Sequence, residues 1–192
     1  MVYGIVNPNG GQNVSASQFG QRVKAAIDDL DLRVASVEGN QQRIVKRGRR
    51  LVSSGNFTTT ETPILRVDDI PVLAGSIYRI ATSSVNVDTS VAHDVVSARF
   101  RVQFSASPGT PATVSSTLID IVRNAIDDIA QSNAVPGHCF YIATTTGYIS
   151  VLLSAQRVAG TGTLFWQCSS TEPLDLTVEY GGDDPGDTGV VL

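Results

Sequence analysis

Residues 96–105 have the sequence VSARFRVQFS, and this stretch decides the fold class of the chain. Its apolar residues occupy every second position: Val96, Ala98, Phe100, Val102 and Phe104. Successive side chains of a β-strand point to opposite faces of a sheet. The alternation therefore predicts a strand with one buried face and one polar face.

Six further runs between residues 63 and 192 have the same β-like character, at 64–67, 76–82, 140–144, 148–155, 163–168 and 174–180. Turn signals rich in glycine and proline separate several of them. Seven or more short strands with such turns predict a mainly β head, an antiparallel β-sandwich resembling a jelly roll, over residues 63–192. The segment from Leu118 to Gln131 is ambiguous, because its apolar spacing fits both a strand and a helix face. We expect a strand to about Ile121, followed by a short helical or irregular stretch.

Upstream of this region, a heptad pattern predicts a coiled coil over residues 16–50. Its seam recurs at alternating steps of four and three residues: Val23, Ile27, Leu30, Val34, Val37, Gln41 and Ile44. β-Branched residues dominate this seam, which favours three strands, and the single polar residue Gln41 would fix the register. The chain is therefore expected to form a homotrimer.

Residues 33–38, RVASVE, resemble the Arg-hydrophobic-x-x-hydrophobic-Glu motif of short trimeric coiled coils. The resemblance implies an ion pair across the trimer interface, from Arg33 to Glu38, with the aliphatic stem of the arginine covering the seam.

The segments on either side of the helix are expected to serve as a docking peptide and a linker. Residues 1–15 contain the turn signal Asn-Pro-Asn-Gly-Gly beside a small apolar patch formed by Val2, Tyr3, Ile5 and Val6. The alternatives are a disordered terminus and a docking segment presented in three copies, and we favour docking. Residues 51–62, LVSSGNFTTTET, are polar and are expected to form an extended linker.

Composition excludes several classes of protein. Of the 192 residues, 42% are hydrophobic and 17% are charged, which is typical of neither a disordered nor a membrane chain. No apolar run reaches the roughly 20 residues that span a bilayer, and no signal peptide is visible. Residues 1–55 carry eight basic and four acidic groups, a net charge of 8 − 4 = +4, whereas the whole chain carries −4. We interpret the basic residues 46–50 as a solvated or acid-paired neck, and nucleic acid is the least favoured partner.

The sequence offers no catalytic constellation, metal site or cofactor site. Its two histidines, His93 and His138, have no second ligand at metal-binding spacing. Cys139 and Cys168 lie in strand-like surroundings and are expected to be buried free thiols, with a disulfide between them as the alternative. Two aromatic residues, Tyr148 and Trp166, are candidate contacts for a glycan, although aromatic residues in strands more often belong to the core.

Several stretches resemble small virion proteins of tailed bacteriophages, especially those of actinobacteria. They are residues 14–19 and 23–34 with Glu38 near the N-terminus, and residues 99–102, 112–117, 151–162 and 178–190 in the β-rich part. The resemblance implies a non-enzymatic minor tail, fibre or capsid-decorating protein with a docking peptide, a trimeric coil and a β-rich head, and without a cofactor. Its partner would be another virion protein, and it would be assembled into the virion in the bacterial cytoplasm. The alternative is a host-surface carbohydrate-binding protein, with a depolymerase as the lesser variant.

Overall fold

The structure is a computed structural model, and it describes residues 23–24, 43–83, 86–127, 129, 133–135 and 137–183. The chain divides into two compact units, residues 1–41 and 42–192. In the first unit only Val23 and Lys24 are described, both with helical backbone. The docking segment, the Arg33–Glu38 pair and the seam positions from Ile27 to Gln41 lie outside the described residues, so these predictions remain untested.

The described residues of the second unit form eleven strands. In chain order they are β1 (Arg43–Arg50), β2 (Thr62–Val72), β3 (Ser76–Thr82), β4 (Asn86–Thr89), β5 (Asp94–Ser105), β6 (Thr117–Ile126), β7 (Asn133–Ala134), β8 (Gly137–Ala143), β9 (Gly147–Ala159), β10 (Leu164–Trp166) and β11 (Leu174–Asp183).

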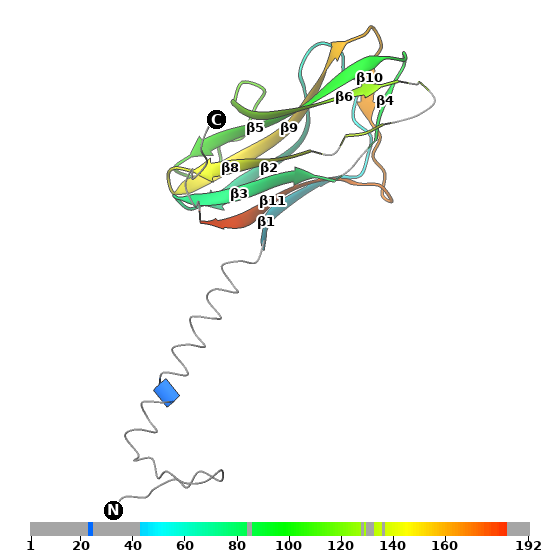
Figure 1. The fold of residues 1–192 in the computed structure, drawn as a ribbon. Coiled ribbons are helices and arrows are strands. Elements are labelled where there is room, and N and C mark those ends of the chain that lie inside the picture. The colour runs from blue at the N-terminus through cyan, green and yellow to red at the C-terminus, as the bar shows by residue number, and fades with distance from the viewer. Residues whose placement is uncertain are drawn as a thin grey trace, which may run out of the picture. The chain divides into compact units, whose positions relative to one another are not determined.

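Eight of these strands form two four-stranded antiparallel sheets, in the orders β1-β11-β3-β8 and β2-β9-β5-β6 (Figure 1). The pairing is nested, because β1 pairs with β11, β2 with β9, β3 with β8 and β5 with β6. A long antiparallel ribbon that is rolled up in this way is a jelly roll, as the sequence predicts. The short strands β10, β4 and β7 form a third, smaller sheet.

The hydrophobic core lies between the inner faces of the two large sheets. β5 confirms the prediction for residues 96–105, since Val96, Ala98, Phe100 and Val102 are all buried. Ile80 of β3 and Leu176 of β11 meet them from the opposite sheet within one core cluster. The other six predicted runs each overlap a strand, and residues 76–82 coincide with β3, whereas the runs 140–144 and 163–168 extend beyond β8 and β10.

The predicted helix is wrong at its C-terminal end. Residues 43–50 form β1, which pairs along its length with β11, so their backbone bonds go to a neighbouring strand. Ile44 therefore lies in this strand with 53% of its surface exposed, and it does not belong to a coiled-coil seam. Gly48 allows β1 to cross β2 closely, because a Cβ there would lie 2.7 Å from Cγ2 of Val67. The three-four spacing at Ile44 continues the heptad pattern by coincidence.

The predicted linker at residues 51–62 is part of the head. Phe57 is buried, and its backbone forms a bridge with Leu164 at the edge of the small sheet. Arg50 donates to the carbonyl oxygens of Val52 and Ser53, which ties the segment to the end of β1. The segment 51–62 therefore belongs to the head, together with β1. Its polar composition suggests a linker, but its few apolar and charged side chains contact the rest of the head.

The segment from Leu118 to Gln131 continues as a strand beyond the expected end at Ile121. β6 runs to Ile126 because β5 offers it a partner along that whole length, from Val102 opposite Thr117 to Asp94 opposite Ile126. The prediction of a helical or irregular stretch is therefore wrong for residues 122–126.

Candidate functional site

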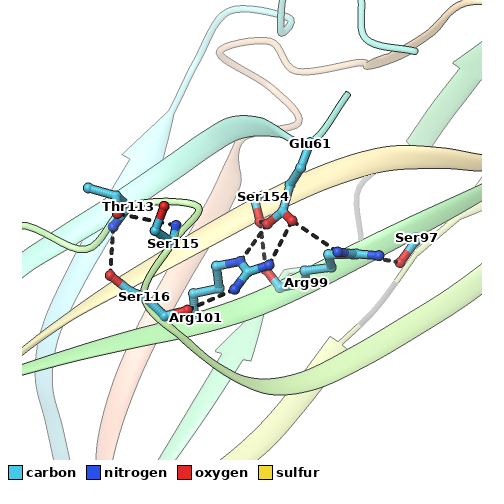
Figure 2. A network of polar contacts seen from close by, with 8 residues as sticks. All are labelled: Glu61, Ser97, Arg99, Arg101, Thr113, Ser115, Ser116 and Ser154. Atoms are coloured by element: carbon cyan, nitrogen blue, oxygen red, sulfur yellow. Dashed lines mark hydrogen bonds and ion pairs between the residues drawn. The ribbon is translucent and has the colours of Figure 1, made fainter. Parts of the chain in front are cut away.

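The main polar cluster of the head surrounds Glu61, on the outer face of the sheet β2-β9-β5-β6 (Figure 2). Arg101 donates from Nε to Oε1 at 2.6 Å and from Nη2 to Oε2 at 2.7 Å, which is a bidentate pair. Arg99 adds a bond from Nη1 to Oε2 at 3.0 Å, and Ser154 Oγ donates to Oε1 at 2.5 Å. The side chains of Glu61 and Arg101 are each only 12% exposed.

These contacts fix the protonation state of Glu61. Burial by itself raises the pKa of this carboxyl group, but the hydrogen bonds from Arg101 and Ser154, the charge of Arg101 and the bond from Arg99 outweigh it and lower the pKa to about 2. At neutral pH the carboxylate is ionised and accepts four hydrogen bonds. Such a group has no proton to donate and is a poor base, so the cluster is suited to holding the chain together and not to acid–base catalysis.

The same cluster holds the loop between β5 and β6. Arg101 Nη1 donates to the carbonyl oxygen of Ser116 at 2.7 Å, and Ser116 Oγ donates to Gln103 Oε1 at 3.1 Å. Within the loop, the Thr113 amide donates to Ser116 Oγ. Figure 2 shows Arg101, Thr113 and Ser116 beside the Glu61 centre. The contacts tie residue 61, two central strands and the 113–116 turn to one point.

A second polar knot lies at the start of β5, where Asp94 is fully buried. Its carboxylate accepts a hydrogen bond from the hydroxyl of Thr89 and one from the amide of Gly162 at 3.1 Å. Gly160 has a φ of 89°, and a Cβ at that position would overlap Oδ1 of Asp94. The turn after β9 therefore needs glycine for both its conformation and the close approach of the carboxylate.

The basic residues at the start of the head are largely used within the chain, which agrees with the acid-paired alternative for the neck. Arg49 makes a bidentate pair with Asp175, at 2.7 Å from Nε and 3.0 Å from Nη2. Lys46 Nζ donates to the carbonyl oxygens of Asp68 and Asp69. Arg50 donates to the carbonyl oxygen of Ile64 in addition to its two local bonds. These contacts reduce the number of basic side chains in residues 46–50 that could bind the phosphate groups of a nucleic acid.

The candidate nucleophiles and bases are not brought together. His138 is exposed on β8 and stacks edge to face on Phe140, whereas the neighbouring Cys139 points inward and is buried. Burial raises the pKa of the Cys139 thiol to about 12. Cys139 and Cys168 are both buried free thiols, which confirms the favoured prediction over the disulfide. His93 is exposed beside Asp127, at the opposite end of β5 from the turn that precedes β6.

The two candidate glycan contacts differ in accessibility. Trp166 is completely buried in the core, so its prediction as a surface contact is wrong. Trp166 lies on β10 of the small sheet, and its ring belongs to the hydrophobic core cluster. Tyr148, at the start of β9, is partly exposed.

Two further findings concern the described residues alone. Among them, no group of three or more His, Cys, Asp or Glu side chains is placed to hold a metal ion. Among the same residues, no helix has the length and apolar character needed to cross a bilayer.

The cluster around Glu61 is the feature that sequence reasoning missed. Glu61 lies in the predicted linker, and the alternation of residues 96–105 places Arg99 and Arg101 on the polar face of their strand without indicating a partner for them. A signal was present, since Arg99 and Arg101 lie two residues apart on the same face of the most strongly alternating strand. Two neighbouring arginines on a central strand suggest a nearby acidic partner, but the sequence does not indicate which aspartate or glutamate it is.

Comparison with known proteins gives little guidance. No family model matches the chain. No curated protein matches it either. Among solved structures, the VP2 subviral particle of infectious bursal disease virus matches with a TM-score of 0.37 and 10% identity, over 76% of this chain and 38% of that one. A structure of the Gt strain of the same virus matches with a TM-score of 0.32 and 14% identity, over 76% and 36%. This chain thus spans less than two fifths of either matched chain, and likenesses at this level assign neither fold nor function.

Proposed function

We propose that this chain is a non-enzymatic structural protein of a bacteriophage particle, a short homotrimeric fibre or decoration protein. Residues 1–15 would dock to another virion protein, the heptad segment would set the three-fold symmetry, and the β head would project outward. The observation that carries the proposal is the nested jelly-roll pairing of the head directly after a heptad segment. Jelly rolls are used by viral capsid proteins and by lectins.

The chemistry of the head favours the structural role over the carbohydrate-binding alternative. In the cluster around Glu61, each carboxylate oxygen accepts two hydrogen bonds from within the chain, which fixes a loop and a connecting segment. A glycan site needs exposed aromatic rings beside free polar groups. Of the two predicted glycan contacts, Trp166 is buried in the core and Tyr148 is only partly exposed. A single fold can serve many functions, so the jelly roll alone does not establish this role. The proposal therefore depends on the homotrimer that the heptad segment is expected to form.

Sedimentation equilibrium on the full chain tests the trimer. The expected result is a mass of three chains that persists at low micromolar concentration. A substitution of Val34 and Val37 by aspartate should convert the trimer to monomers, because both lie in the predicted seam. Replacing the polar residues Asp29 and Ser36 by alanine, outside the seam, is the matched control. A monomeric full chain would overturn the assignment.

Particle incorporation tests the docking segment separately. Deleting residues 1–15 should abolish incorporation and leave the trimer intact. A deletion variant that is still found on purified particles would contradict the docking role but not the trimer.

A further inference from the structure

The outer face of the sheet β1-β11-β3-β8 has an ordered arrangement of residues that the function proposed above does not use. The register places four residues in one row across the four strands: Ile44, Glu179, Arg79 and Phe140. Read across the sheet, the row is apolar, acidic, basic and apolar. In the next row, Thr177 of β11 lies beside Ala81 of β3, with Arg47 of β1 and His138 of β8 at the two ends.

Both ends of this row are unusually exposed. Ile44 is 53% exposed and Phe140 is 60% exposed, and Ile142 two residues further along β8 is 48% exposed. β8 lies at the end of the sheet order, and strands at sheet edges are commonly protected by lysine or proline. β8 contains neither, and the whole chain has only two lysines.

The charges in the middle of the row are already paired. Arg79 Nη1 lies 2.8 Å from Glu179 Oε2, with the arginine 32% and the glutamate 15% exposed. Covering this face therefore leaves neither charge without a partner, which removes the main cost of burying charged groups.

The row is also complementary to itself. A two-fold axis parallel to the strands, lying between two such faces, would bring β11 of one copy opposite β3 of the other, and β1 opposite β8. Glu179 then faces Arg79 of the second copy, and Ile44 faces Phe140 of the second copy. An axis perpendicular to the strands would instead place Glu179 opposite Glu179, so the charges select the first arrangement. The small residues Thr177 and Ala81 would let the two sheets approach.

We infer that the outer face of the sheet β1-β11-β3-β8 is a two-fold contact surface for a second copy of this chain. The inference stands without the coiled-coil trimer. Four strands of about seven residues offer roughly 450 Å² per copy, from the ordinary strand spacing and rise. Stable interfaces bury about 800 Å² on each side, so the contact is weak for single heads. Where heads are already held in groups, multivalency makes it effective.

Sedimentation velocity of the full chain, from about 5 to 500 µM, tests the surface. We expect a concentration-dependent species with twice the mass of the basal one. Phe140→Ser should weaken the association about tenfold or more, because an exposed aromatic residue is the expected anchor. Leu118→Ser is the matched control, since Leu118 is 38% exposed on β6 of the other sheet. Equal association constants for the two variants would overturn the inference.

Charge exchange tests the symmetry. Arg79→Glu and Glu179→Arg each place like charges opposite one another in a two-fold pair, so neither variant should self-associate. Mixed together they should associate, because every cross-copy contact then joins an acid to a base. The double variant carrying both changes should self-associate like the original chain. Circular dichroism must show that each variant is folded, and failure of the mixture to associate would rule out this register.

The basal mass separates this inference from the proposed function. A trimer that doubles supports both, and a monomer that doubles supports the surface while removing the trimer. A trimer that does not double at any concentration retains the trimer and removes the surface.

Discussion

The outer faces of the two large sheets differ in the way they use charge and apolar area. On the sheet β2-β9-β5-β6, Glu61 and Arg101 are almost completely covered and tie the chain to itself. On the sheet β1-β11-β3-β8, Phe140 and Ile142 are left open to solvent beside a paired Arg79 and Glu179. One face is closed around an ion cluster, and the other leaves apolar side chains open to solvent beside its ion pairs.

The difference indicates what each face is for. A covered ion cluster contributes to one conformation of a single chain, because breaking it strands a charge in a poorly solvated place. Exposed apolar groups contribute nothing until another surface covers them. Substitutions on the first face should therefore change the free energy of unfolding of a single chain, whereas substitutions on the second face should change it very little.

The largest effect is expected from Glu61→Gln. The variant removes the charge that balances Arg99 and Arg101 while it keeps the shape of the side chain. We expect the free energy of unfolding to fall by about 2 to 3 kcal/mol, as for a mostly buried ion pair that loses one partner. Urea unfolding at a fixed protein concentration measures it. Arg66→Gln, in an ion pair that is 44% and 36% exposed, is the control and should cost less than about 1 kcal/mol.

The pH dependence of the same pair follows from the pKa of Glu61. In the folded chain this pKa is about 2, below its ordinary value of 4.5, so the folded state binds the proton more weakly than the unfolded state does. The stabilisation is complete above about pH 4.5 and is lost as the pH falls toward 2. The gap in unfolding free energy between the original chain and Glu61→Gln should therefore close over that interval. A gap that stays constant between pH 6 and pH 3 would show that the charge of Glu61 does not stabilise the fold.

Gly160→Ala should cost about 2 kcal/mol, since it adds a Cβ at positive φ where Asp94 Oδ1 already lies. Gly109→Ala is a matched control, with a φ of 101° and open space around the added Cβ. Its cost should be about 1 kcal/mol, the price of the conformation alone. Thermal unfolding measures the fall in Tm of each variant. Equal falls would mean that the close approach of Asp94 adds nothing to the cost of Gly160→Ala.

The sequence predicts the features of the head that leave a local pattern and misses those that depend on distant partners. Period-two alternation identifies β5 and the other main strands, because one buried face per strand leaves a local signal. The role of Glu61 has no local signal, since its partners lie about 40 residues away on a strand that only the fold brings near. β1 was assigned to a helix for a related reason. Ile44 fits a heptad locally, but pairing with β11, more than 120 residues downstream, decides its conformation.

The smallest effect is expected from Phe140→Ser, and it is the most direct test of the contrast between the two faces. The ring is 60% exposed, so the single chain loses little buried area when it is removed. The free energy of unfolding at low micromolar concentration should change by less than about 0.5 kcal/mol, as for other surface substitutions. At high concentration the original chain should gain stability from self-association, whereas the variant should not, because mass action stabilises only a folded state that binds. A large loss at low concentration would instead show that Phe140 packs within its own head, and the two faces would then be alike in serving the single chain.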